Sequence, residues 1–172
     1  MGNMARPRTN HPPLYTAAER VRRDRSPWTI VQGVLAPLQF IAFLVSVVLV
    51  VRFLATGEGL QAATASVLVK TGFLYAIMVT GAIWEKAVFG QYLFARSFFW
   101  EDVVSMGVIA LHTAYLYSWF AGTLAPRGQM LLALAAYASY AINAAQFLLK
   151  LRAARLQASS EVAGAVPAGA GQ

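Results

Sequence analysis

Acidic and basic side chains gather in residues 80–106, where one long apolar segment ends and another begins. Glu85 and Lys86 lie at the end of the first segment, and Glu101 and Asp102 lie at the start of the second. The loop between them is crowded with aromatic side chains, namely Phe89, Tyr92, Phe94, Phe98, Phe99 and Trp100. Carboxyl groups at the mouth of a helix bundle, beside a flat aromatic surface, indicate proton transfer to or from a large apolar ring.

The amino-acid composition predicts the environment of these charged and aromatic side chains. Of the 172 residues, 58% are hydrophobic and 12% are charged, whereas a soluble domain carries about 25% charge. The sequence therefore predicts a membrane protein. It contains no cysteine, which excludes disulfides, thiol catalysis and cysteine-ligated metal or iron–sulfur sites. Its histidines, His11 and His112, are too few for a multi-histidine metal site within the chain.

Four apolar runs are long enough to cross a bilayer as helices, which takes about 20 residues each. They cover residues 28–55, 61–84, 100–121 and 128–151, and each break between them contains Gly or Pro, as expected of a helix end. We therefore expect an all-α fold: an integral membrane four-helix bundle within a transmembrane domain of residues 28–157.

Polar segments flank this domain. Residues 1–27 form a basic N-terminal arm, in which Thr16 and Glu19 have the spacing of a capping box. This spacing predicts a short helix that ends at Arg25 and lies at the membrane interface. Residues 158–172 are rich in Ala and Gly and predict a disordered tail.

Lys and Arg residues lie mainly on one side of the predicted bundle. Arg52 and Arg127 lie on the opposite side. Because basic residues accumulate in cytoplasmic segments, both termini should be cytoplasmic. This asymmetry, with attraction to anionic lipid, explains the net charge of +7, so the lipid bilayer is an expected partner and nucleic acid is not. The basic residues on the cytoplasmic side are Arg6, Arg8, Arg20, Arg22, Arg23, Arg25, Lys86, Arg96, Lys150, Arg152 and Arg155.

Each predicted span carries polar side chains at helical spacing, which indicates a bundle with a polar interior. Such residues commonly form hydrogen bonds between helices, but they also act as ligands or proton carriers, and the pattern leaves both roles open. Lys70 is the hardest to explain as an interfacial charge, because it lies deep within its span. In each span these polar residues lie along one face of the helix and form a polar stripe. In chain order, the four stripes contain Gln32, Gln39 and Ser46; Lys70 and Glu85; Glu101, Ser105 and His112; and Ser139, Asn143, Gln146 and Lys150.

Longer motifs follow one another along the chain: SPWTIVQGVLAP (26–37), MVTGAIWEKAVFGQYLFA (78–95), FFWEDVVSM (98–106), ALHTAYL (110–116) and YAINAAQFLLKLRAARLQ (140–157). Together they resemble the vinyl bacteriochlorophyllide hydratase family. The resemblance implies an enzyme of bacteriochlorophyll biosynthesis in the cytoplasmic membrane, inner or intracytoplasmic, of a photosynthetic bacterium. It also implies addition of water to the ring-A vinyl group of a magnesium chlorin or bacteriochlorin, which gives a 1-hydroxyethyl group.

This reaction fits the carboxyl groups described above. Protonation of the terminal vinyl carbon leaves a cation on the inner carbon, where the macrocycle delocalises the charge and water attacks. An acid, a positioned water and a base are needed, but no redox or organic cofactor. Water is the co-substrate, and magnesium belongs to the substrate. A carboxyl group keeps its proton at neutral pH only where burial or a neighbouring negative charge opposes ionisation, and two adjacent helices would supply both conditions.

We expect Glu85 or Glu101 to be the acid, with Asp102 as their carboxyl neighbour. The other carboxylate or His112 would orient or deprotonate the water; alternatively, His112 would be an axial ligand of the substrate magnesium. The aromatic rings would stack on the macrocycle. The expected substrate contacts are Lys70, Trp84, Lys86, Phe98, Phe99, Trp100 and Asn143.

Three other classes of protein compete with this interpretation. A non-catalytic pigment-binding or assembly protein of the photosynthetic membrane would use the same aromatic loop and His112. A b-type cytochrome needs two intramembrane histidines, and only His112 lies in a span. A small transporter would use Lys70 and the carboxylates as a proton relay, although the sequence has no apparent internal repeat. Other enzymes of the bacteriochlorophyll pathway are candidate partners.

Overall fold

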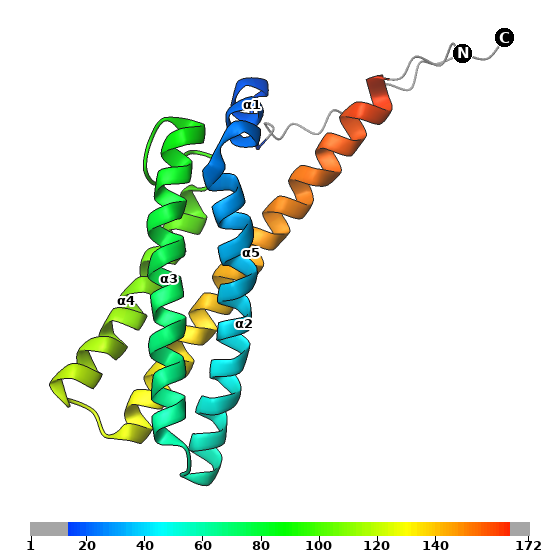
Figure 1. Ribbon diagram of the computed structural model, residues 1–172. Helices are drawn as coiled ribbons and strands as arrows, with labels where there is room; N and C mark the ends of the chain where they lie inside the picture. Colours follow the sequence, from blue (N-terminus) through cyan, green and yellow to red (C-terminus); the bar gives the residue numbers. More distant parts are fainter. Residues whose placement is uncertain (1–13, 166–172) are drawn as a thin grey trace.

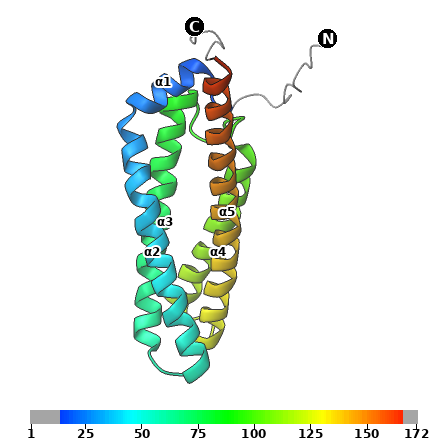
Figure 2. The ribbon, with the colours of Figure 1, turned by 90° about the vertical axis from the view of Figure 1, so that its right-hand side faces the viewer.

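Four long helices run side by side, and a short helix lies at one end of them (Figures 1 and 2). The protein is described by a computed structural model that covers residues 14–165. The four long helices are long and apolar enough to cross a membrane, so the predicted all-α fold with four membrane-length helices is confirmed. The helices are α1 (Ala17–Arg25), α2 (Pro27–Thr56), α3 (Leu60–Phe89), α4 (Phe99–Ala121) and α5 (Pro126–Ala165).

The short helix α1 begins at the predicted capping box. Thr16 Oγ1 accepts a hydrogen bond from the Glu19 N–H at 3.3 Å, and Glu19 Oε2 accepts one from the Thr16 N–H at 2.7 Å. These bonds satisfy amide donors that the first turn of a helix leaves free. Later in α1, Arg22 Nε donates to the Val88 carbonyl oxygen at 2.7 Å. This bond fixes α1 against the end of α3.

The long helices associate as two antiparallel pairs. α2 packs along α3, α4 packs along α5, and α2 also contacts α5 to join the pairs (Figure 2). Val67, Tyr115 and Met130 are fully buried in the shared apolar core. Within this core the Ser46 hydroxyl hydrogen-bonds with that of Tyr137. Ser46 on α2 therefore points into the bundle, as its place in the predicted polar stripe indicated, and its hydrogen-bond partner Tyr137 lies on α5.

The helix α3 extends one turn beyond its predicted end. It continues past Trp84 to Phe89 and ends at Gly90, whose φ of 87° takes the chain out of helical geometry. Glu85 therefore belongs to the helix, and the connecting loop is shorter than the aromatic segment suggested. The helix holds Glu85 in a fixed position, which a loop of the predicted length would not do.

The last helix, α5, also extends beyond its predicted end. It continues past Leu151 to Ala165, so residues 158–165, which were predicted to belong to a disordered tail, are helical. Ala and Leu are strong helix formers, and an established helix propagates through them at little cost. Residues 1–13 of the predicted arm and 166–172 of the predicted tail lie outside the described residues.

Candidate functional site

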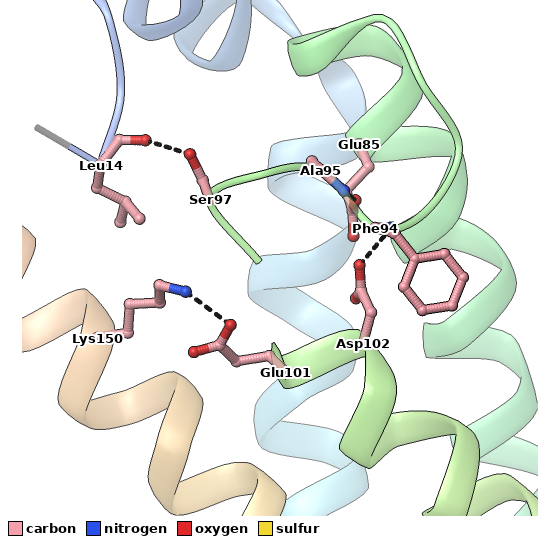
Figure 3. A network of polar contacts seen from close by, with 8 residues as sticks. All are labelled: Leu14, Glu85, Phe94, Ala95, Ser97, Glu101, Asp102 and Lys150. Atoms are coloured by element: carbon pink, nitrogen blue, oxygen red, sulfur yellow. Dashed lines mark hydrogen bonds and ion pairs between the residues drawn. The ribbon is translucent and has the colours of Figure 1, made fainter. Parts of the chain in front are cut away.

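Two carboxyl groups from different helices meet beneath the loop that joins α3 to α4 (Figure 3). Glu85, near the end of α3, and Asp102, in the first turn of α4, are both buried. Glu85 Oε2 accepts a hydrogen bond from the Ala95 N–H at 3.2 Å, and Asp102 Oδ2 accepts one from the Phe94 N–H at 2.7 Å. The two carboxyl groups also lie close enough for their charges to interact. Two buried carboxylates this close are costly to ionise together, which favours a state in which one of the two groups carries a proton.

The loop above the pair has an unusual backbone conformation. Phe94 has a φ of 59°, which is rare for a bulky residue and needs support from its surroundings. Part of this support comes from the segment before α1, because the Ser97 hydroxyl donates to the Leu14 carbonyl oxygen at 2.8 Å (Figure 3). The result is that the consecutive amides of Phe94 and Ala95 both donate to the carboxyl pair.

A third carboxyl group, Glu101, points away from this pair and toward α5 (Figure 3). Its Oε2 lies 2.6 Å from Lys150 Nζ, and the two groups form a mostly buried ion pair. Lys150 Nζ also lies 5.0 Å from the centroid of the Phe98 ring. Glu101 and Asp102 are thus adjacent in sequence but have different neighbours. The neighbour of Glu101 is the Lys150 cation, whereas the neighbour of Asp102 is the carboxyl group of Glu85.

His112 and Lys70 form a separate polar cluster, deeper in the bundle. His112 Nδ1 donates to the Val108 carbonyl oxygen at 2.8 Å, and His112 Nε2 hydrogen-bonds with Lys70 Nζ. The Lys70 nitrogen lies 4.3 Å from the centroid of the Tyr140 ring. Asp102 and His112 are separated by about 15 Å of helix, at ~1.5 Å per residue. The structure therefore does not bring His112 or Lys70 to the carboxyl pair.

The aromatic side chains fall into a buried set and an exposed set. Phe98 is only 2% exposed and stacks on Phe147, with 5.8 Å between ring centroids. Trp84 packs edge-on against Phe98, also at 5.8 Å. By contrast, Phe99 and Trp100 lie on the exterior, where Trp100 is 71% exposed. Of the four rings predicted to stack on a macrocycle, Phe99 and Trp100 are accessible from outside and Phe98 is not.

Tyr15 covers the buried aromatic set from the N-terminal side. Its ring stacks on Phe89 with 5.8 Å between centroids, and it lies 6.3 Å from the Phe98 ring. The Arg23 guanidinium lies 4.8 Å from the centroid of the Tyr15 ring. Burial raises the pKa of the Tyr15 phenol above its ordinary value, and Arg23 partly opposes this rise. The segment before α1 therefore covers the same end of the bundle that holds the carboxyl pair.

The two remaining predicted contacts lie in different surroundings. Asn143 is buried, and its Nδ2 donates to Ser105 Oγ at 2.8 Å, one helical turn beyond Asp102 on α4. Lys86 is exposed, and its Nζ donates to the Gly90 carbonyl oxygen at 2.7 Å. Asn143 thus belongs to the interior of the bundle, while Lys86 lies on the outer surface of the last turn of α3.

Three residues of this region were not among the predicted site residues. Lys150 could have been found, because it follows Asn143 by two helical turns and shares its face. Tyr15 and Ser97 gave no such signal. They join the site through contacts between residues that are far apart in sequence, such as the Ser97–Leu14 hydrogen bond, and helical spacing says nothing about these contacts.

Four apolar membrane-length helices with buried carboxyl groups at one end define the class of a multi-pass membrane protein with a polar cluster at one end of its bundle. The model of the family described as 2-vinyl bacteriochlorophyllide hydratase (BCHF) matches residues 15–153. The chain belongs to this family, and the resemblance noted in its motifs is confirmed.

The names of two relatives agree with this assignment. The chain is 71% identical to the 2-vinyl bacteriochlorophyllide hydratase of Rhodobacter capsulatus over 151 residues, which cover 88% of each chain. It is 66% identical to the protein of the same name from Cereibacter sphaeroides over 151 residues, which cover 87% of this chain and 93% of the relative. No solved structure matches the chain.

Proposed function

We propose that this protein adds water to the vinyl group of a bacteriochlorophyllide, giving the 1-hydroxyethyl compound in bacteriochlorophyll synthesis. Family membership and the names of the two relatives support this reaction. The structural observation that supports it best is the close, buried pair of carboxyl groups of Glu85 and Asp102. Two carboxyl groups that share one proton can donate it from one oxygen and accept a proton at another, as hydration requires.

The pair can complete a catalytic cycle without any other proton carrier. Its shared proton goes to the terminal vinyl carbon, which becomes a methyl group. The resulting cation on the inner carbon is delocalised into the macrocycle, and the oxygen of water bonds to this carbon. The second proton of the water then goes to the ionised carboxylate. The pair again holds one proton, so Glu85 and Asp102 are ready for the next substrate.

The ion pair of Glu101 and Lys150 has a different role in this proposal. Because Glu101 is held by a cation, it serves as a fixed charge that positions the start of α4, rather than as the acid. The cluster of Lys70 and His112 stabilises the middle of the bundle. Magnesium ligation by His112 is the weaker alternative, because Lys70 already contacts the ring nitrogen that would bind the metal.

The macrocycle docks on the exposed aromatic surface in this proposal. Phe99 and Trp100 present their rings outside the bundle, next to the loop that covers the carboxyl pair. A flat apolar ring system gains both burial and stacking energy on such a surface. Lys86, exposed on the last turn of α3 before this loop, offers a cation for the free propionate carboxylate that distinguishes a chlorophyllide from an esterified pigment. Magnesium enters as part of the substrate, and water is the only co-reactant in the scheme.

The orientation in the membrane follows from charge. The carboxyl end of the bundle also carries α1, the loop residue Arg96 and the basic end of α5 (Figure 1). Arg52 and Arg127 lie toward the opposite end. The positive-inside rule therefore supports cytoplasmic termini and a substrate site that opens to the cytoplasmic face of the cytoplasmic membrane.

The decisive experiment incubates membranes containing the protein with vinyl bacteriochlorophyllide in ¹⁸O-labelled water and follows the pigment by chromatography and mass spectrometry. A product that has gained one labelled water supports the proposed reaction. Pigment that co-purifies with the protein but remains unchanged would contradict it and favour the non-catalytic pigment-binding alternative.

A further inference from the structure

The segment before α1 contacts both ends of the loop that joins α3 to α4. Near the end of this loop, the Ser97 hydroxyl donates to the Leu14 carbonyl oxygen at 2.8 Å (Figure 3). The Tyr15 ring stacks on Phe89, the last residue of α3, and lies 6.3 Å from the ring of Phe98, which precedes α4. Leu14 and Tyr15 therefore connect the two ends of the loop.

The conformation of this loop is costly and depends on its contacts. Phe94 has a φ of 59°, and holding a bulky residue in this left-handed region costs free energy of the same order as a hydrogen bond. One bond within the loop opposes this cost, because the Phe98 N–H donates to the Ala95 carbonyl oxygen at 2.7 Å. The bond from Ser97 to Leu14 is a second. Since the cost and each bond are similar in size, losing one bond should weaken the hold on the loop conformation.

The conformation of the loop determines where its amide donors lie. The Phe94 N–H donates to Asp102 at 2.7 Å. The Ala95 N–H donates to Glu85 at 3.2 Å. Ser97 follows Ala95 by only two residues, so a shift of Ser97 away from the segment before α1 displaces these donors. The contact that Ser97 makes therefore acts on the carboxyl pair without touching it.

We propose that Ser97 and Tyr15 are positioning residues for hydration. They hold the segment before α1 against the α3–α4 loop, and the amides of this loop then fix the orientation of the two carboxyl groups. The inference rests on the proposed function and adds two residues to its machinery. Neither residue touches the reacting atoms, so each acts only through the loop.

The orientation of the carboxyl pair determines the stereochemistry of the product. Addition of water turns the inner vinyl carbon into a stereocentre that carries a hydroxyl, a methyl, a hydrogen and the macrocycle. The attacking water transfers its proton to the same pair that protonated the vinyl group, so a fixed pair directs water to one face of the cation. A pair that moves with a loosened loop directs water to both faces and gives two epimers.

The test measures the proportion of the two epimers. Membranes containing the protein are incubated with vinyl bacteriochlorophyllide, and the 1-hydroxyethyl epimers are separated by chromatography and quantified by mass spectrometry. Membranes that lack the protein supply the background to be subtracted. The proportion does not depend on how much folded protein is present. A purely structural role for Ser97 or Tyr15 would therefore lower the yield without changing the proportion.

Ser97→Ala should raise the proportion of the minor epimer about fivefold, the effect of losing one hydrogen bond. Ser97→Thr keeps the hydroxyl and should restore the original proportion. The matched control is Ser118→Ala at the other end of α4, where the hydroxyl donates to the Tyr115 carbonyl oxygen at 2.9 Å, and it should change nothing. If Ser97→Ala does not accumulate in membranes, Ser97→Cys, a weaker donor, replaces it.

Tyr15 is tested through its ring. Tyr15→Ala removes the stacking on Phe89 and should raise the minor epimer, whereas Tyr15→Phe keeps the ring and should not. Hydration that continues with an unaltered proportion in Ser97→Ala and Tyr15→Ala overturns the positioning role but leaves the proposed function standing. Equal amounts of both epimers from the unaltered protein would also overturn it, because a fixed pair must favour one face. Failure of the unaltered protein to hydrate overturns both.

Discussion

Glu85 and Asp102 belong to different helices, yet consecutive backbone amides hold their carboxyl groups together. The Ala95 N–H donates to Glu85 at 3.2 Å, and the Phe94 N–H donates to Asp102 at 2.7 Å. The backbones of α3 and α4 approach each other less closely than those of the pairs α2–α3 and α4–α5, so the loop above the carboxyl pair contributes strongly to its geometry.

Replacing either member of the pair by its amide should abolish hydration while leaving the fold intact. Glu85→Gln and Asp102→Asn keep the size of the side chain but cannot carry the shared proton, so turnover should fall by at least about 100-fold. Turnover of vinyl bacteriochlorophyllide in membranes measures the effect. Glu58→Gln is the matched control, because Glu58 is exposed at the opposite end of the bundle. Substantial turnover in Glu85→Gln would remove Glu85 from the mechanism.

The ion pair of Glu101 and Lys150 should behave as a structural unit. Lys150→Met leaves Glu101 mostly buried without its cation and should lower the free energy of unfolding by roughly 2 kcal/mol. The double variant Lys150→Met, Glu101→Gln should recover much of this loss, because no unpaired charge remains. Thermal unfolding in detergent measures both. Equal destabilisation by the single and the double variant would show that the pairing itself contributes little.

The buried and exposed aromatic residues should differ in what they affect. Phe98→Ala removes a buried ring and should cost about 3–5 kcal/mol of stability. Trp100→Ala removes an exposed ring, so stability should change little, while KM for the pigment should rise roughly tenfold, equivalent to ~1.4 kcal/mol of binding. Unfolding curves and pigment titrations distinguish these effects. An unchanged KM in Trp100→Ala would argue against docking of the macrocycle on this surface.

The burial of Tyr15 predicts a loss of stability in alkaline solution. Folding raises the pKa of the phenol, so the neutral form is favoured in the folded protein. The stabilisation is fully present below about pH 10, the ordinary pKa of tyrosine, and is lost as the pH rises further. Tyr15→Phe keeps the stacking on Phe89 but cannot ionise, so its midpoint of thermal unfolding should fall less than that of the unaltered protein above pH ~10. Parallel curves for the two proteins would contradict this expectation.

The proposed orientation can be tested with introduced cysteines, since the chain has none of its own. Gln91→Cys lies on the exposed loop at the carboxyl end, and Thr123→Cys lies on the exposed turn at the other end. A membrane-impermeant maleimide should label Gln91→Cys only from the cytoplasmic side and Thr123→Cys only from the opposite side. The reverse pattern would place the carboxyl pair outside the cytoplasm.

The sequence alone was sufficient to predict the four spans and the inward-facing polar stripes. Apolar length and helical spacing are local properties of one segment of the chain. Each helix in a bilayer must satisfy its own backbone hydrogen bonds and cover the apolar thickness of the membrane, so these local properties are sufficient to predict a span. The capping box of α1 was predicted for the same reason, because its hydrogen bonds join residues three apart. The residue types of the candidate site were also evident, since carboxyl groups inside a membrane protein are rare and costly.

Only the tertiary structure decided which carboxyl groups are partners. In sequence, Glu101 and Asp102 are neighbours and equal candidates, but a helix turns successive side chains by about 100°. Asp102 therefore meets Glu85 on α3, while Glu101 meets Lys150 on α5. The placement of His112 with Lys70 depends in the same way on how the two helix pairs pack against each other. Such packing sums weak contacts between residues distant in sequence, and no single segment of the chain specifies it.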